Sequence, residues 1–179
     1  MKKYRSVLSP VLWMGMFVIL LLNASVARAA SQSDVFLGIS HLGQNTYYSN
    51  AGGQWGWNGA LHIHLRPFLG VEGDVAQYGW GAQSNVPHST TVMFGPRFTV
   101  GGAGIHVFVH GLAGIEHVNN ANTSPTTGTQ MSVAAGGGLD LPIAPFFSWR
   151  IMADYVAGSG DAPYASSHNR VSTGVAFHF

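Results

Sequence analysis

The sequence contains no cysteine and has few charged residues. Without cysteine there is no disulfide framework and no thiolate metal site. Only 8% of the residues are charged, whereas ordinary soluble domains carry about 25%. Lysine occurs only at positions 2 and 3, so the chain after residue 29 has four arginines against seven acids, a balance of 4 − 7 = −3. This part of the chain therefore offers no basic patch for a nucleic acid.

The start of the chain has the features of a secretory leader. Positive residues precede an apolar run from Val7 to Leu22, and Ala27 and Ala29 supply the small residues that a signal peptidase needs. An uncleaved single-helix anchor is the alternative, but the run is short for ~30 Å of hydrocarbon. We therefore predict a signal peptide over residues 1–29 and a single domain over residues 30–179.

The last segment, from Asn169 to Phe179, alternates between two kinds of residue. Arg170 and the small or polar side chains of one parity alternate with Val171 and the mainly apolar side chains of the other. The segment from Ser148 to Ala157 repeats this design. A period of two indicates a strand with two different environments on its two faces. Charged residues among small ones are typical of the lumen of a membrane barrel.

Turn signals divide the rest of the chain into similar alternating segments, each about as long as the ~9–11 residues of a tilted membrane strand. Short connections alternate with longer ones rich in Asn, Ser, Thr, Gly and Pro, which favour turns and solvated loops. This predicts an all-β, eight-stranded antiparallel up-and-down transmembrane β-barrel with both ends on the periplasmic side. The predicted strands cover residues 33–42, 54–66, 68–79, 89–100, 105–118, 129–141, 146–157 and 169–179.

Most charged residues share the inward parity of these segments. The interior of an eight-stranded barrel is filled by side chains, and buried charges must be paired. We therefore predict a lumen charge network, and no cofactor. An alternative is a metal site made by His62 and His64 with His106 or His110, but alternating histidines are not a specific signal, and no metal ligand is assigned. The predicted network consists of Arg66, Glu72, Asp74, Arg97, Glu116, Asp140, Arg150, Asp154 and Arg170.

The outward parity is apolar, with aromatic residues gathered near the segment ends. Such bands fit the interfacial girdles of a membrane barrel. The core of a soluble sandwich is the alternative, but its polar face would need more charge. Pro96 interrupts the fourth segment, where we expect a bulge or a non-bonded position. The girdle residues are Trp55, Trp57, Tyr78, Trp80 and Tyr155 near the longer connections, and Phe68, Phe98, Phe147, Trp149 and Phe179 near the short turns.

Two other functions compete with a structural barrel. A narrow pore or transporter for ions or very small solutes fits the polar lining, although eight strands leave no wide channel. An outer-membrane lipid hydrolase needs a serine, a histidine and an acid that face the membrane. Here the acids face inward, and His117 is the one outward histidine expected near a strand end. Because no serine is an evident partner, no catalytic residue is assigned.

Several motifs occur in an order and spacing that is more specific than any one of them. They are Gly56 to Gly59, Leu69 to Asp74, Phe94 to Phe98, Gly136 to Asp140 and Arg170 to Phe179. With them the chain resembles the small outer-membrane β-barrel proteins related to the OmpA transmembrane domain, in the version common among Acidobacteria-like Gram-negatives. The resemblance implies an eight-stranded barrel without catalytic residues. It also implies assembly by the outer-membrane insertion machinery, with Phe177 and Phe179 in the terminal-strand signal.

The sequence therefore favours an integral barrel of the Gram-negative outer membrane, with a structural or surface-interaction role and no enzymatic activity. The four longer connections are expected to carry this role, because loops on a rigid scaffold commonly carry recognition. The expected partners are outer-membrane lipid, the insertion machinery and a loop partner that the sequence does not name. The barrel is expected to be a monomer.

Overall fold

A computed structural model describes residues 33–43, 53–79, 88–102, 105–119, 127–159 and 167–179. The predicted signal peptide lies outside these residues. No helix in these ranges is long and apolar enough to cross a membrane. The strands are β1 (Asp34–Leu42), β2 (Gln54–Arg66), β3 (Leu69–Tyr78), β4 (His88–Gly102), β5 (Ile105–Asn119), β6 (Thr127–Ala144), β7 (Phe147–Gly158) and β8 (Ser167–His178).

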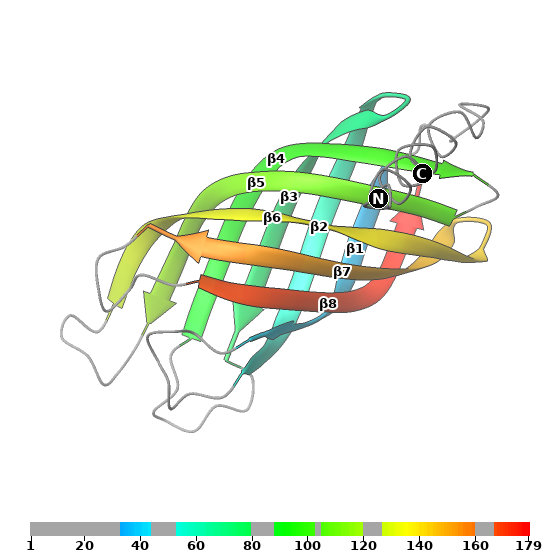
Figure 1. Cartoon of the computed structure of the whole chain (residues 1–179). Coiled ribbons are helices and arrows are strands. Elements are labelled where there is room, and N and C mark those ends of the chain that lie inside the picture. Colours follow the sequence, from blue (N-terminus) through cyan, green and yellow to red (C-terminus); the bar gives the residue numbers. More distant parts are fainter. Residues whose placement is uncertain (1–32, 44–52, 80–87, 103–104, 120–126, 160–166) are drawn as a thin grey trace, which may run out of the picture.

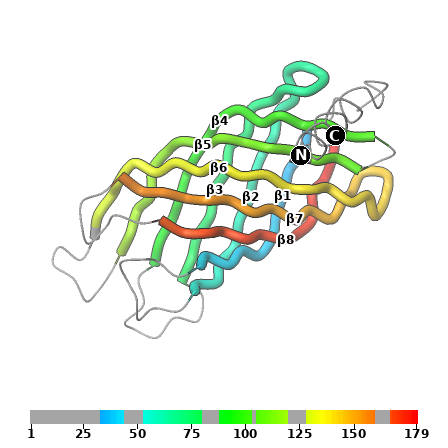
Figure 2. Tube along the Cα trace, viewed as in Figure 1, coloured from blue at the N-terminus to red at the C-terminus, as the bar shows by residue number. Residues whose placement is uncertain are grey.

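The strands form one closed barrel in the order of the sequence. Each strand pairs antiparallel with the next, and β1 pairs with β8 to complete the ring. Figure 1 shows the strands running obliquely along the molecule, and the tube in Figure 2 follows their alternating course. Closure pairs the strands that would otherwise be open edges. The predicted eight-stranded antiparallel up-and-down barrel is confirmed, and the predicted segments match the strands to within a few residues.

Both ends of the described chain lie at one end of the barrel. Asp34 at the start of β1 pairs with His178 at the end of β8, and the backbone N–H of Phe179 donates to the carbonyl of Ser33 at 2.9 Å. The tight turn between β2 and β3 and the one between β6 and β7 lie at this same end. The longer connections join the strands at the opposite end of the barrel. They include residues 44–52, 80–87, 120–126 and 160–166, which lie outside the described residues.

Pro96 occupies a non-bonded position in β4 and causes no bulge. The pairing of β4 with β5 passes from Phe94 opposite Ala113 to Arg97 opposite His110 with the same register on both sides. Gly95 and Pro96 have no ladder partner on β5, although both are paired with β3. Proline has no N–H to donate to the ladder, so the sheet omits these pairs and keeps its register.

The two parities face the two environments that the alternation predicts. In β8, Arg170 is 1% exposed and its neighbour Val171 is 52% exposed. The lumen also contains apolar side chains, which were not among the predicted inward residues. Phe36, Phe108 and Met152 form one buried cluster with small residues of neighbouring strands. The interior is therefore a filled core in which apolar side chains lie next to charged ones.

Most of the predicted girdle aromatics lie on the outer face, but Tyr78 does not. Trp55, Phe68, Trp149 and Phe179 are among the exposed aromatic side chains of the outer wall. Tyr78 is only 1% exposed, and its hydroxyl lies 3.2 Å from the Ser40 hydroxyl inside the barrel. Its assignment to the girdle was wrong, because its parity on β3 is that of the inward side chains. Trp80 lies outside the described residues.

Candidate functional site: the lumen network and the outer wall

Arg150 is the centre of the network at the end of the barrel with the tight turns. Its Nε and Nη2 donate to the two carboxylate oxygens of Asp140 at 2.6 and 2.7 Å. Its Nη1 lies 2.8 Å from Asp34 Oδ1. Asp140 is the direct cross-strand partner of Arg150 in the β6–β7 hairpin, so the local register creates this two-point contact. A bidentate pair fixes both position and orientation.

Arg97 joins this group to the middle of the lumen. Its Nη1 donates to Glu72 Oε2 at 3.1 Å and lies 3.5 Å from Asp34 Oδ2, while Nη2 donates to Asp140 at 3.4 Å. The guanidinium carbon lies 3.7 Å from the centre of the Phe108 ring. An arginine stacked on an aromatic face is stabilised by the ring quadrupole. The apolar side chains of the lumen thus contact the charges directly.

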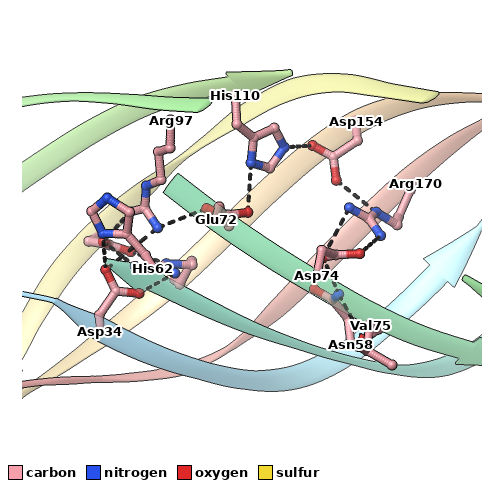
Figure 3. Close-up of polar contacts among 12 residues, drawn as sticks. Asp34, Asn58, His62, Glu72, Asp74, Val75, Arg97, His110, Asp154 and Arg170 are labelled. Carbon is pink, nitrogen blue, oxygen red and sulfur yellow. Dashed lines mark hydrogen bonds and ion pairs between the residues drawn. The ribbon is translucent and has the colours of Figure 1, made fainter. Parts of the chain in front are cut away.

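His110 connects the two halves of the network. Its Nδ1 lies 2.8 Å from Glu72 Oε1 and its Nε2 lies 2.7 Å from Asp154 Oδ1, as Figure 3 shows. A neutral imidazole has a single N–H, and a carboxylate can only accept. Two such contacts with ionised carboxylates require both ring nitrogens to carry hydrogen. The geometry therefore fits an imidazolium between two carboxylates.

Arg170 organises the half of the network toward the longer connections. Its Nε donates to Asp154 Oδ2 at 2.7 Å, and its Nη1 donates to Asp74 Oδ1 at 2.8 Å. Asn58 Nδ2 donates to Asp74 Oδ2 at 2.6 Å. The contacts therefore form a continuous path from Asp34 to Asn58, part of which Figure 3 shows. Each of the eight strands contributes at least one side chain to the network.

The network brings oppositely charged side chains together in the buried lumen. Five carboxylates face three guanidinium groups and the imidazoles of His62 and His110. None of these side chains is more than 5% exposed. An unpaired buried charge costs several kcal/mol, so such a set is stable only when its members are paired. The arrangement joins opposite walls of the barrel, since Arg170 of β8 contacts Asp74 of β3.

Seven of the nine predicted network residues are brought together. They are Glu72, Asp74, Arg97, Asp140, Arg150, Asp154 and Arg170. Glu116 is also buried but lies on a different part of the wall, where it accepts a hydrogen bond from Gln130 Nε2 at 2.9 Å.

Arg66 was wrongly placed in the network. It is exposed at the end of β2, and no ion pair of the described residues includes it. The pairing of β2 with β3 shifts register between His64 and Arg66. An irregularity of this kind re-aims the side chains that follow it, so the parity rule fails for the last residue of the strand.

Asp34 belongs to the network, although it was not among the predicted network residues. Asp34 is 2% exposed and contacts His62, Arg97 and Arg150. Its parity matches that of Ser40, which is also buried. The signal was obscured because Phe36, an apolar residue, shares the inward parity and blurs the alternation of β1.

Three pairs of polar side chains form hydrogen bonds on the outer wall. Trp149 Nε1 donates to Thr173 Oγ1 at 2.7 Å, and Trp57 Nε1 donates to Gln77 Oε1 at 3.1 Å. His117 lies on the outer face, with its Nδ1 2.8 Å from the hydroxyl of Thr129. These contacts provide hydrogen-bond partners for polar groups on an apolar surface. Each of them joins neighbouring strands across the surrounding apolar surface.

His117 is not the one outward histidine near a strand end. His41 shares the parity of the exposed Leu37 and Ile39, and its ring contacts the exposed Trp55 ring at 4.8 Å between centroids. No acid in the described ranges accompanies either histidine on this face, because all of those acids are buried in the lumen. The described outer wall therefore presents no serine–histidine–acid arrangement.

The chain is similar in fold to small outer-membrane barrels of known structure. No family model matches the sequence, and no curated protein matches it. The attachment invasion locus protein Ail of Yersinia pestis superposes with a TM-score of 0.54 at 19% identity, covering 83% of this chain and 99% of Ail.

Two further structures support the same assignment. Neisserial surface protein A gives a TM-score of 0.62 at 12% identity, with coverage of 82% and 97%. The N-terminal β-barrel domain of Pseudomonas aeruginosa OprF gives 0.52 at 19% identity, also with coverage of 82% and 97%. At these identities the comparisons establish the fold, which is that of the eight-stranded outer-membrane barrels.

Proposed function

We propose that this chain is an integral, monomeric β-barrel of the Gram-negative outer membrane, with a structural or surface-interaction role and no catalysis. One observation carries the proposal: the outer face of the barrel is apolar, and the inner face carries the buried charges. The outer wall is apolar around the barrel, with Leu37 63% exposed, Phe94 69% exposed and Val133 52% exposed, while Arg97, Arg150 and Arg170 lie inside. In lipid, the closed ring leaves no open strand edge, and the arrangement keeps these charges away from the outer band.

The structure does not favour the narrow pore. The lumen contains Arg97, Arg150 and Arg170, each at most 1% exposed, together with their carboxylate partners. Small eight-stranded barrels are just wide enough for side chains to fill. We therefore expect the wild-type protein to show no steady conductance in planar bilayers. A reproducible single-channel current would support the pore instead.

The proposed surface role belongs to the four longer connections. They contain no lysine or arginine and one acid, Asp161, among many Asn, Ser, Thr and Gly residues. Ail has been solved in complex with the heparin analogue sucrose octasulfate, but the connections of this chain have no basic residues to match such a polyanion. Neutral polar partners suit them better. The motifs quoted above are the support for placing the chain in the Acidobacteria-like version of the family.

Topology and membrane insertion are tested together by cysteine labelling, because the chain has no cysteine of its own. Asn50→Cys lies in a longer connection, and Ala144→Cys is the matched control at the opposite end of the barrel. With a membrane-impermeant maleimide, Asn50→Cys is expected to react in intact cells. Ala144→Cys is expected to react only after the envelope is broken. The reverse result would overturn the orientation, and absence from the membrane fraction would overturn the proposal.

Assembly is the second part of the proposal. The insertion machinery is expected to recognise the terminal strand, where Phe177 and Phe179 both point outward and are 42% and 60% exposed. Heat-modifiability on a gel, combined with membrane fractionation, measures the folded barrel directly. We expect the chain to remain in the periplasm when the insertion machinery is absent. We expect it to fold when the machinery is present.

A further inference from the structure

Two histidines in the lumen have ring nitrogens without a partner. His62 and His64 lie two residues apart on β2, so both point inward, at the end of the barrel with the tight turns. His62 is 2% exposed and His64 is half-buried. The Nε2 atoms of both rings are buried and make no hydrogen bond. A buried polar atom left unsatisfied costs about 1–3 kcal/mol, so two neighbouring ones call for an explanation.

The contacts of His62 decide which of its nitrogens is available. Its Nδ1 lies 3.0 Å from Asp34 Oδ2, and a carboxylate can only accept, so Nδ1 carries the hydrogen. In the neutral ring, Nε2 then presents a lone pair. Asp34 is itself held by Arg97 and Arg150. A carboxylate that orients a histidine through its other nitrogen is the usual outer-shell arrangement around metal-binding imidazoles.

Gly70 creates the space that the His62 ring occupies. Gly70 is the cross-strand partner of His64, and a Cβ at position 70 would lie 2.1 Å from His62 Nε2. Because glycine has no side chain, the Nε2 edge of the His62 ring can lie over β3, beside His64. The two ring centroids are 5.9 Å apart, with the ring planes at 85°. Two imidazoles that bind one metal at about 2.0–2.1 Å have centroids roughly 5–6 Å apart, so the observed spacing is suitable.

We propose that His62 and His64 form an open, two-imidazole site for a divalent late first-row transition-metal ion, with Cu²⁺ bound most strongly. Imidazole nitrogen suits these ions, and their affinities rise to Cu²⁺. Water would fill the other coordination positions, because the described residues contain no group of three or more ligating side chains arranged around one point. Asp34 and Glu72, close to His62 on the neighbouring strands, offset the charge of Arg97.

An open site of this kind is peripheral to folding. The ion pairs of the lumen do not depend on His64, which belongs to none of them. His64→Gln therefore removes one ligand and leaves these ion pairs intact. His117→Gln is a matched control, because His117 is a histidine of the outer wall. His106→Gln tests the other lumen pair, since the His106 ring lies 6.4 Å from that of His178.

The experiment is a Cu²⁺ titration of the purified protein in phosphatidylcholine vesicles, followed by calorimetry and by electron paramagnetic resonance. The wild type is expected to bind one Cu²⁺ with two nitrogen ligands. His64→Gln should weaken binding at least about tenfold and remove one nitrogen from the spectrum, while His117→Gln should change neither. Gly70→Ala should also weaken binding, by about 10–100-fold if it acts like an outer-shell change. Heat-modifiability shows in each case that the barrel is folded.

Three results would overturn the proposal. Folded wild-type protein that binds no Cu²⁺ would mean that a water molecule satisfies the two nitrogens. Equal binding by His64→Gln and the wild type would place any copper elsewhere. Loss of binding in His106→Gln, with binding retained in His64→Gln, would move the site to the other histidine pair. None of these results bears on the outer-membrane role, which the labelling experiment tests separately.

Discussion

Replacing Arg150 by methionine is the most direct test of the lumen network. Methionine keeps most of the length and the apolar stem of arginine but removes the guanidinium. The change deletes two hydrogen bonds to Asp140, at 2.6 and 2.7 Å, and the 2.8 Å contact with Asp34. Both carboxylates then remain inside the barrel, where Asp140 and Asp34 are 1% and 2% exposed.

The structure sets the expected magnitude. Removing one partner of a buried pair typically costs about 3–5 kcal/mol, because the surviving charge is stranded. Here Arg97 still reaches Asp140 at 3.4 Å and Asp34 at 3.5 Å, which partly compensates the loss. We therefore expect Arg150→Met to lower the free energy of unfolding by about 3 kcal/mol, near the lower end of that range. A double-mutant cycle with Asp140→Asn should give a coupling energy of about 1–3 kcal/mol.

Arg66→Met is the matched control, since it makes the same chemical change at an exposed arginine. It should alter the free energy of unfolding by no more than about 0.5 kcal/mol. Urea unfolding in lipid vesicles, followed by tryptophan fluorescence, measures both variants. If Arg150→Met costs no more than Arg66→Met, or if the changes at Arg150 and Asp140 are simply additive, the buried pairing does not stabilise the barrel as argued.

Three further changes test other parts of the structure. Val71→Arg places a charge on the outer wall opposite Pro96, near the centre of β4. It should cost about 2–4 kcal/mol near the midplane of the bilayer, and a harmless result in vesicle unfolding would argue against a lipid-facing wall. Gly136→Ala brings a Cβ within 2.1 Å of the Asp154 carboxylate and should destabilise by about 1–3 kcal/mol. Gly111→Ala, whose Cβ meets nothing within 4 Å, should be mild by comparison. Phe179→Ala should slow assembly in cells more than it lowers the stability of inserted barrels, and wild-type levels and folding rates would refute the assembly role.

The strands and the inward parity could be predicted because a period of two depends only on local sequence. Neighbouring strands also make some pairs predictable in retrospect, since Asp140 lies directly opposite Arg150 and Asp154 directly opposite Arg170. A charge network in the lumen could be predicted, but the exact pairing across the lumen could not. Arg170 meets Asp74, 96 positions away, only because the stagger of the strands brings the two to the same depth.

The errors at individual residues have separate causes. Arg66 follows a register shift that a parity rule cannot include. Tyr78 was placed by its closeness to a strand end, although its parity on β3 is that of Asp74. His110 was considered only as a possible metal ligand, and its place between two carboxylates depends on β3 and β7 at once. The surroundings of His110 are therefore set by three strands together.

The pairing of β1 with β8 has a consequence for how the barrel forms. It joins Asp34 to His178, almost the whole described chain apart, so it closes the longest loop and has the largest entropic cost. Before this step both strands are open edges with unpaired backbone groups. Asp34 then also lacks the fixed position beside Arg97 and Arg150 that the closed ring provides. Backbone closure and charge neutralisation therefore take place in the same event. A barrel that lacks its last strand gains neither the closed backbone pairing nor the charge neutralisation. Barrel formation should therefore be close to all-or-none.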